Sequence, residues 1–80
     1  MQSKEELEQQ QKQQLFKLLA WVGSQTQLAR QLGVSRQVVA GWVKRGRIAA
    51  KYATEVERKT DGLFKRADMR PDVFEWFEEV

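Results

Sequence analysis

Glycine residues divide this chain into short segments, and each segment carries apolar side chains at the spacing of a helix. Gly23, Gly33 and Gly46 each follow a run whose apolar residues recur every three or four positions, and Asp61-Gly62 follows another. Glycine often ends helices because it adopts the left-handed backbone conformation without a steric penalty. The chain is therefore predicted to form helices at about 4–22, 26–32, 35–45 and 49–60. Ser24 or Thr26 can cap the second of these helices, and Ser35 can cap the third.

The two ends of the chain are less regular than its middle. Ser3 and Glu6 have the spacing of a capping box, so the first helix is expected to start there, with its first turns projecting into water. Residues 63–69 fit either an extended segment or one helical turn, and Pro71 suits the first position of a last short helix. The expected core consists of apolar residues: Leu15, Leu18, Leu19, Val22, Leu28, Ala29, Leu32, Val39, Trp42, Val43, Ala53 and Val56, with either Ala50 or Tyr52 and with Val38 at the edge of the stripe.

The absence of two residue types narrows the possible functions. The chain has no histidine, which is the commonest general base, and no cysteine, which is a frequent metal ligand. We therefore expect no enzymatic activity, no metal site and no cofactor. No stretch reaches the roughly 18 apolar residues of a membrane-spanning helix, and the polar start does not resemble a secretory leader. A cytoplasmic protein without a membrane partner is expected.

Charge is distributed unevenly along the sequence. Residues 9–54 contain eight lysines and arginines and no carboxylate, whereas residues 1–8 carry a net −2 and residues 55–80 a net −3. An ordinary protein surface mixes the two signs. A long region with cations alone favours a polyanion as the partner. Eighty residues allow one small domain, in which residues 1–14 form a polar, partly exposed helical extension and residues 71–80 an acidic, aromatic tail.

Residues 25–44 have the pattern of two helices joined by a tight turn. Gly33 supplies the turn, and Ala29, one helical turn earlier, is small enough to let the next helix approach closely. Val39 and Trp42 are placed to bury that next helix against the core. This pattern predicts a helix-turn-helix, whose second helix is available to a DNA major groove. The predicted fold class is an all-α, compact helix-turn-helix bundle of four to five helices.

The same stretch resembles the helix-turn-helix of the Cro and phage-repressor family, in the lambda-repressor-like superfamily. The sequence QTQLARQLGVS at 25–35 is similar to Cro-type sequences. Residues 42–50 match the W-x-x-R-G-R-I-P-A pattern of YdaS-type Cro-like prophage regulators, with Ala49 in place of the usual proline. Residues 70–73 match the R-P-D-hydrophobic segment of those regulators, and the whole resemblance covers about residues 15–74.

The resemblance implies that residues 15–70 are a DNA-binding domain that reads an operator, usually as a dimer, on the bacterial nucleoid. By position, Ser35, Arg36 and Gln37 begin the recognition helix and would contact base edges. Arginine pairs with guanine and glutamine with adenine through two hydrogen bonds each. Ala40 and Gly41 stand where relatives often carry polar readers. Ala40 would touch a thymine methyl, or the small pair would let the helix sit deeper.

The resemblance also implies contacts with the DNA backbone. Gln25 and Gln27, at the start of the second helix, stand where relatives touch phosphate. Lys44, Arg45 and Arg47 would bind further phosphates, which gives register and salt dependence but no sequence information. Each assignment has an alternative. Arg36 and Gln37 can be solvated helix residues, and Gln25 can merely cap or solvate a helix end. The cations fit a helix C-terminus whose dipole they complement.

The tail DVFEWFEEV combines acidic and apolar residues, and because its acids should repel phosphate it is expected to lie away from the duplex. Two arrangements remain open: the tail folds back on its own core, or it packs on a second copy and forms a homodimer, which we favour. The leading function is a double-stranded DNA-binding regulator of the Cro type. The alternative is a protein-interaction module, such as an antitoxin or adaptor, that uses the tail. The expected dimer residues are Phe74, Trp76, Phe77 and Val80.

Overall fold

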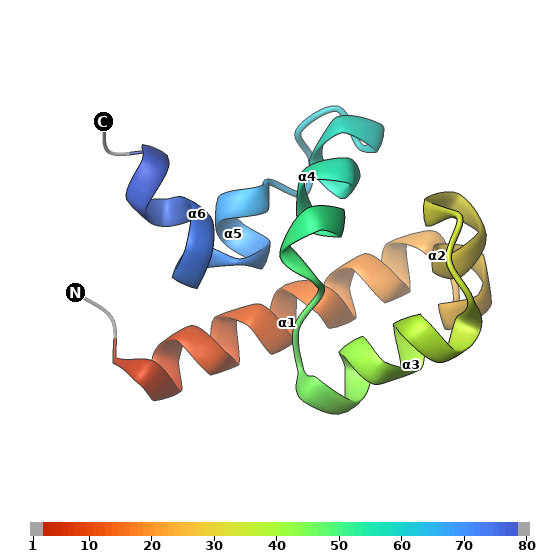
Figure 1. The fold of residues 1–80 in the computed structure, drawn as a ribbon, viewed down its shortest axis with the longest axis horizontal. Coiled ribbons are helices and arrows are strands. Elements are labelled where there is room, and N and C mark those ends of the chain that lie inside the picture. Colours follow the sequence, from red (N-terminus) through yellow and green to blue (C-terminus); the bar gives the residue numbers. More distant parts are fainter. Residues whose placement is uncertain (1–2, 79–80) are drawn as a thin grey trace.

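A long first helix is the base on which the other elements pack (Figure 1). A computed structural model describes residues 3–78 of the chain, with side-chain detail over residues 3–74. The described residues form helices and no strands, which confirms the all-α fold, and one of the helices is a single turn. The helices are α1 (Lys4–Val22), α2 (Gln25–Leu32), α3 (Arg36–Arg45), α4 (Ala50–Lys59), α5 (Arg66–Met69) and α6 (Pro71–Glu78).

Serine caps and glycine stops set the helix ends. The Ser3–Glu6 capping box is formed as predicted. Ser24, not Thr26, caps α2, because its hydroxyl oxygen accepts the Gln27 backbone N–H at 3.1 Å. The helix therefore begins one residue earlier than predicted. Ser35 caps α3 in the same way, so that helix starts at residue 36.

The core is centred on Trp42, whose side chain is 1% exposed. The Trp42 ring packs against Tyr52, with 5.4 Å between the ring centroids. Leu19, Val22, Leu32 and Val43 pack against the core without being fully buried. Ile48, Phe64 and Met69, which the helical spacing did not single out, complete it. The predicted residues that are buried are Leu15, Leu18, Leu28, Ala29, Val39, Trp42, Ala53 and Val56.

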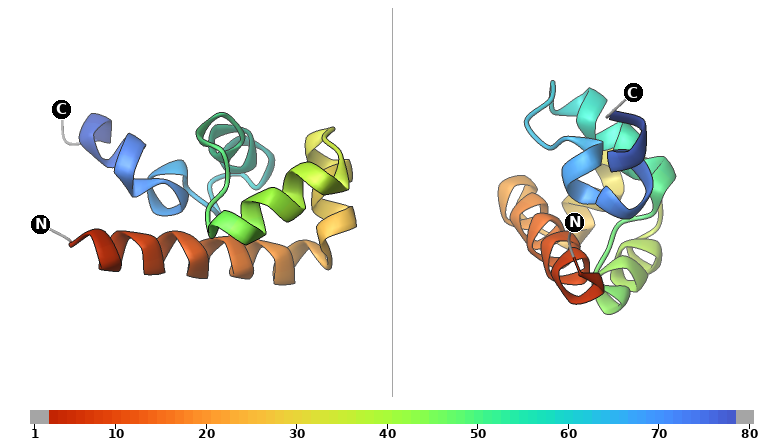
Figure 2. Two further views of the ribbon diagram at one scale, coloured as in Figure 1. Left: turned by 60° about the horizontal axis from the view of Figure 1, so that its bottom comes forward. Right: turned by 90° about the vertical axis from the view of Figure 1, so that its left-hand side faces the viewer.

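The first half of α1 makes more contacts with the rest of the protein than its polar sequence indicates. Lys4 and Glu5 are exposed, as expected, but Gln11 is only 4% exposed. The Gln10 side chain donates a hydrogen bond to the backbone oxygen of Asp68, at 3.3 Å. The expectation that these turns project into water therefore holds only at the start of the helix. The first half of α1 runs beside α6 and then α5, as two further views show (Figure 2).

Residues 63–69, whose sequence fits either an extended segment or a helical turn, contain the one-turn helix α5. The described part of the chain therefore has six helices, against four to five predicted. Pro71 is buried at the start of α6. Phe74 packs against the core, and the Arg66 guanidinium lies 5.3 Å from the centre of its ring. No helix within residues 3–78 has the length and apolar character needed to cross a membrane.

Candidate nucleic-acid interface

The pair α2 and α3 forms the predicted helix-turn-helix. Gly33 has a φ of 68°, in the left-handed region, and ends α2. The Val34 backbone N–H then donates to the Ala29 carbonyl at 3.0 Å, which closes the turn. Ala29 on α2 and Val39 on α3 are both buried, so the two helices share one apolar contact. The direction of α3 is therefore fixed by a closed turn and by the core.

The opposite side of α3 faces solvent. Arg36, Gln37 and Ala40 are exposed on this side. Val38 is also 41% exposed, so the face includes an apolar patch that the sequence placed only at the edge of the buried stripe. The Ser35 hydroxyl oxygen accepts the Val38 backbone N–H at 3.2 Å and so caps the helix. The structure thus brings the predicted base-reading residues together at the start of α3.

Gly41 has a neighbour that the sequence did not indicate. A methyl group built on Gly41 would lie 3.3 Å from Nη1 of Arg45, so the guanidinium of Arg45 lies over the bare backbone of this position. The two residues are one helical turn apart, a spacing at which side chains on a helix meet. The small residue therefore leaves room for an arginine head group on the surface of α3.

The two glutamines of α2 differ in their surroundings. Gln25 is half-buried, whereas Gln27 is exposed. Because Ser24 already accepts the Gln27 backbone N–H, that amide is satisfied within the protein. Any contact of Gln27 with an anion would therefore be made by its side chain.

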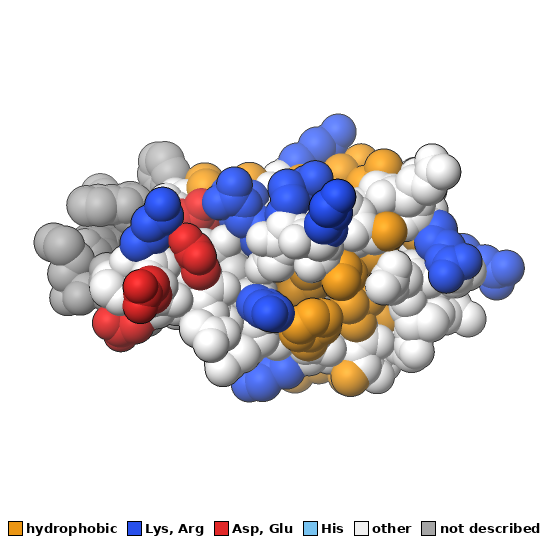
Figure 3. Space-filling view, turned by 90° about the horizontal axis from the view of Figure 1, so that it is seen from below, with side chains coloured by type: hydrophobic (Ala, Val, Ile, Leu, Met, Phe, Trp, Pro, Cys, Tyr) orange, Lys and Arg blue, Asp and Glu red, His pale blue; other side chains and the backbone are white. Residues whose placement is uncertain are grey.

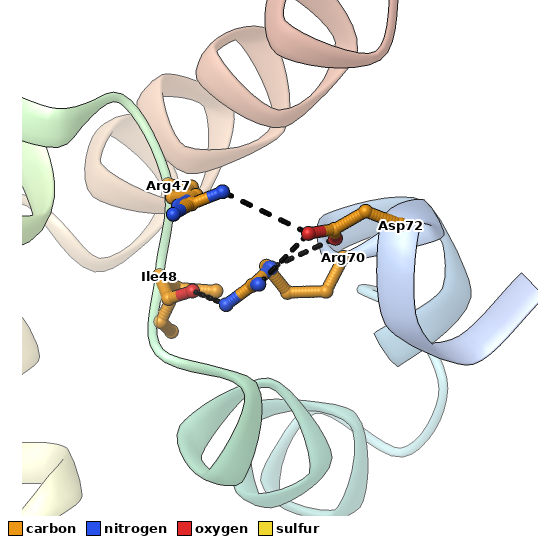
Figure 4. A network of polar contacts seen from close by, with 4 residues as sticks. All are labelled: Arg47, Ile48, Arg70 and Asp72. Atoms are coloured by element: carbon orange, nitrogen blue, oxygen red, sulfur yellow. Dashed lines mark hydrogen bonds and ion pairs between the residues drawn. The ribbon is translucent and has the colours of Figure 1, made fainter. Parts of the chain in front are cut away.

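Arg47 lies in a polar network with the chain's C-terminal region (Figure 4). Its Nη1 is 3.8 Å from a carboxylate oxygen of Asp72. Arg70 binds the same carboxylate and also donates to the Ile48 carbonyl at 2.9 Å. Hydrogen bonds from the Arg70 guanidinium hold the pKa of Asp72 below its usual value. Asp72, the first acidic residue of the tail, thus lies beside Arg47 of the basic region 9–54, because Arg70 holds its carboxylate there.

The charged side chains on the face of the molecule where α1 and α3 lie are mostly cationic (Figure 3). Lysine and arginine side chains are spread along it, and the acidic side chains gather toward the end where α1 begins. Lys44 and Arg45 are exposed at the end of α3, and Arg47 is exposed just beyond it. The predicted basic residues thus share one surface with the exposed side of α3. The spacing of residues in the sequence did not predict that α1 lies on the same surface.

The predicted dimer residues are less completely described. Phe74 packs on the core of its own chain, so at least this part of the tail folds back. Trp76 and Phe77 belong to α6, but their side chains lie outside the described detail, and Val80 lies outside the described residues. The arrangement of the tail beyond Phe74 stays a prediction.

A closed turn between two packed helices, the second with a polar outer face, defines this molecule as a helix-turn-helix protein. The comparisons with known proteins refine this class. A family model described as bacterial toxin YdaS matches residues 15–77. The chain is also 39% identical over 61 residues to the regulatory protein Cro of Pseudomonas phage D3, which covers 74% of this chain and 81% of that protein. No solved structure matches the chain. The chain therefore belongs to the YdaS family, and most of its length is similar to a phage Cro protein.

Proposed function

We propose that this chain is a sequence-specific transcriptional regulator that binds double-stranded DNA, and that it acts as a Cro-type repressor of phage or prophage origin. The observation that carries the proposal is the exposure of Arg36 and Gln37 on a helix whose other side is locked into the core by Trp42. A helix held in this way presents a fixed row of side chains to a major groove. The similarity to a protein named as a phage Cro supports the same function.

Arg36 and Gln37 are the proposed base readers. The arginine fork fits the two acceptors of guanine, and the glutamine amide fits adenine, with about 1–3 kcal/mol of discrimination for each pair. Ser35 keeps its O–H as a donor, because only its oxygen is used in the cap. The Ala40 methyl group is suited to a thymine methyl. Next to Gly41 we assign the DNA contact to Arg45, because its guanidinium lies over the backbone of Gly41.

The remaining cations are proposed to bind the DNA backbone. Lys44 and Arg47 flank the end of α3, and Gln25 and Gln27 begin α2 on the other side of the turn. Contacts with phosphate from both helices would set the register of α3 in the groove without selecting a sequence. Each neutralised phosphate releases counterions, so the affinity should fall steeply as salt rises.

We also propose that the regulator binds as a homodimer through the tail, with Trp76, Phe77 and Val80 as the main contacts and Phe74 at their edge. One short helix in one groove gives limited affinity, whereas two joined copies bind with a large effective concentration. A twofold dimer predicts half-sites about 34 Å apart, which is one turn of the duplex. Such a regulator acts in the cytoplasm, on the nucleoid, and needs no cofactor or enzymatic activity.

The experiment that tests this function is selection of bound sites from a random pool of duplexes, followed by gel shifts with variants. R36A and Q37A should weaken binding to the selected site and leave binding to unrelated duplex nearly unchanged. R30A is the matched control, since Arg30 is exposed near the end of α2, outside the proposed reading residues. If R36A bound the selected site as tightly as R30A does, α3 would not be the reading helix.

A protein-interaction module is the alternative function, and one observation favours it. Trp21 is 56% exposed and lines an apolar groove of about 180 Å³ with residues of α2 and α4. An exposed apolar patch of this kind often marks a partner surface. Retention on a DNA column separates the two functions. Elution that does not change with salt would favour the interaction module.

A further inference from the structure

A cationic groove runs between the first half of α1 and the end of α3. Its walls carry Lys4, Glu8 and Lys12 from α1, together with Lys44, Arg45 and Arg47 from α3 and the turn after it. The groove is open to solvent and has a volume of about 680 Å³. It therefore joins the proposed phosphate-binding residues to two lysines that lie more than thirty residues away in the sequence.

Close packing between the two walls fixes the shape of this groove. Gly46 ends α3 with a φ of 79°, and a methyl group built on it would lie 3.8 Å from the Cβ atom of Lys12. The stem of Lys12 thus packs against the turn, while its amino group belongs to an exposed residue. Gln11, which is 4% exposed, also lines the groove and anchors α1 there.

The charges in the groove are unbalanced. Five of its lining residues are cations, and Glu8 is the single carboxylate among them. Like charges held this close repel one another, and an anion bound between them removes that repulsion. Five cations offer more positive charge than a single small anion can neutralise, so they favour a polyanion as the ligand.

The position of the groove relative to Arg36 and Gln37 points to the backbone of the same DNA. α3 has ten residues, so it is about 15 Å long at 1.5 Å per residue. The major groove of DNA is about 12 Å wide. A helix that reads bases at its first turn therefore has its last turn near the sugar-phosphate backbone.

We infer that this groove binds a run of backbone phosphates of the duplex that α3 reads, with Lys12 and Lys4 as contacts that act together with Lys44, Arg45 and Arg47. This inference rests on the proposed DNA-binding function. On this inference α1 is part of the DNA interface, through phosphate contacts that do not distinguish one base sequence from another. Glu8 opposes the same phosphates and so limits the affinity.

The first test measures the salt dependence of binding to a duplex of unrelated sequence. K12Q keeps the aliphatic stem and the helix propensity of Lys12 but removes its charge. K12Q and K4Q should each weaken binding and reduce the slope of log affinity against log salt by about 0.9. K17Q is the matched control, because Lys17 is exposed on the same helix but does not line the groove. K17Q should keep the slope of the unchanged protein.

The second test is a gain of affinity, which no loss of folding can imitate. E8Q removes the carboxylate from the groove and should tighten binding to the same duplex by about two- to fivefold at low salt. E5Q is the control, because Glu5 is an exposed carboxylate of the same helix outside the groove. E5Q should leave the affinity unchanged.

The outcomes separate this inference from the function on which it rests. If the unchanged protein binds duplex with a salt slope but K12Q matches K17Q and E8Q matches E5Q, the groove is not a phosphate site, while the proposed function stands. If the unchanged protein binds no duplex at any salt concentration, both the inference and the proposed function are overturned.

Discussion

Arg70 holds Asp72 in a bidentate ion pair, with Nε and Nη2 each 2.9 Å from a different carboxylate oxygen. The third nitrogen of the same guanidinium donates to the carbonyl of Ile48 at 2.9 Å. One side chain therefore ties the start of α6 to the turn that follows α3. Since Arg47 is the neighbour of Ile48 and also contacts Asp72 at 3.8 Å, the pair positions a proposed phosphate contact.

The first prediction concerns the response of stability to pH. The Arg70 hydrogen bonds lower the pKa of Asp72 in the folded chain. Its contribution to the free energy of unfolding is therefore complete above the unfolded pKa of about 3.9 and is lost as the pH falls below that value. D72N should destabilise the protein by about 1 kcal/mol at neutral pH, a value reduced for partial exposure.

The measurement for D72N is urea unfolding at neutral pH and again near pH 3. The difference from the unchanged protein should be smaller at the acidic pH, because Asp72 takes up its proton in the unfolded chain before it does so in the folded chain, where its pKa is lowered. D61N is the control, because Asp61 is exposed and has a φ of 56°, which asparagine tolerates. A difference that stayed constant with pH would contradict the role of the carboxylate charge.

The second prediction tests the geometry of Arg70 at constant charge. The side chain of Arg70 is 12% exposed, and its three bonds come from a planar fork that lysine lacks. R70K should lower the free energy of unfolding by about 1–3 kcal/mol, since it leaves an acceptor without its donor. R58K is the matched control, because Arg58 is exposed on the surface of α4. Equal stability of R70K and R58K in urea unfolding would show that charge alone matters.

The third prediction is a gain in stability at Gly41. Glycine inside a helix costs about 0.5–1 kcal/mol relative to alanine. The group nearest to a new methyl is the end of the flexible Arg45 side chain, which can move aside. G41A should therefore raise the free energy of unfolding by up to about 1 kcal/mol. G33A should instead lower it, because Gly33 has a φ of 68°. Thermal unfolding of both variants checks the opposite signs.

The fourth prediction compares two tryptophans. Trp42 is 1% exposed and Trp21 is 56% exposed. W42A removes the centre of the core and should cost about 3–5 kcal/mol, enough to unfold a domain of this size. W21A should cost much less, because more than half of Trp21 is already exposed to solvent and its ring meets Phe64 edge-on, with 5.9 Å between the ring centroids. The far-ultraviolet circular dichroism of the two variants at room temperature is the measurement, and a folded W42A would contradict the assigned core.

The fifth prediction addresses the proposed dimer. Sedimentation of the unchanged protein at micromolar concentration should give the mass of two chains, and F77D should give the mass of one. The new carboxylate would have to be buried without a partner at the interface, which is costly. L63D is a control, because Leu63 is 60% exposed and far from the tail in sequence. An unchanged mass for F77D would remove Phe77 from the interface.

Local features of the sequence were enough to predict most of the fold. Glycine stops, serine caps and apolar spacing placed four helices within one or two residues of their observed ends. Trp42 was identified as core because it continues a stripe that starts at Val39. These features depend on neighbours within one helical turn, so they can be read without knowledge of the tertiary structure.

Contacts between distant segments could not be predicted in the same way. Gln11 is buried where α1 meets the end of α3, about thirty residues later in the sequence, and a polar residue carries no periodic signal of burial. The place of Lys12 beside Gly46 and of Asp72 beside Arg47 likewise depends on how the helices pack. The charge pattern indicated a basic surface, but only the packing of α1 on the end of α3 gives that surface its shape.

The sharing of one core by all the helices has a consequence for any attempt to shorten this protein. Leu28, Val39 and Trp42 are buried in a core that they share with residues of α1, α4 and the segment around Met69. A peptide holding α2 and α3 alone would leave that apolar side in water, and helices so short do not persist unaided. The proposed reading helix is therefore inseparable from its support: on the proposed function, the smallest piece able to bind a duplex would be nearly the entire domain.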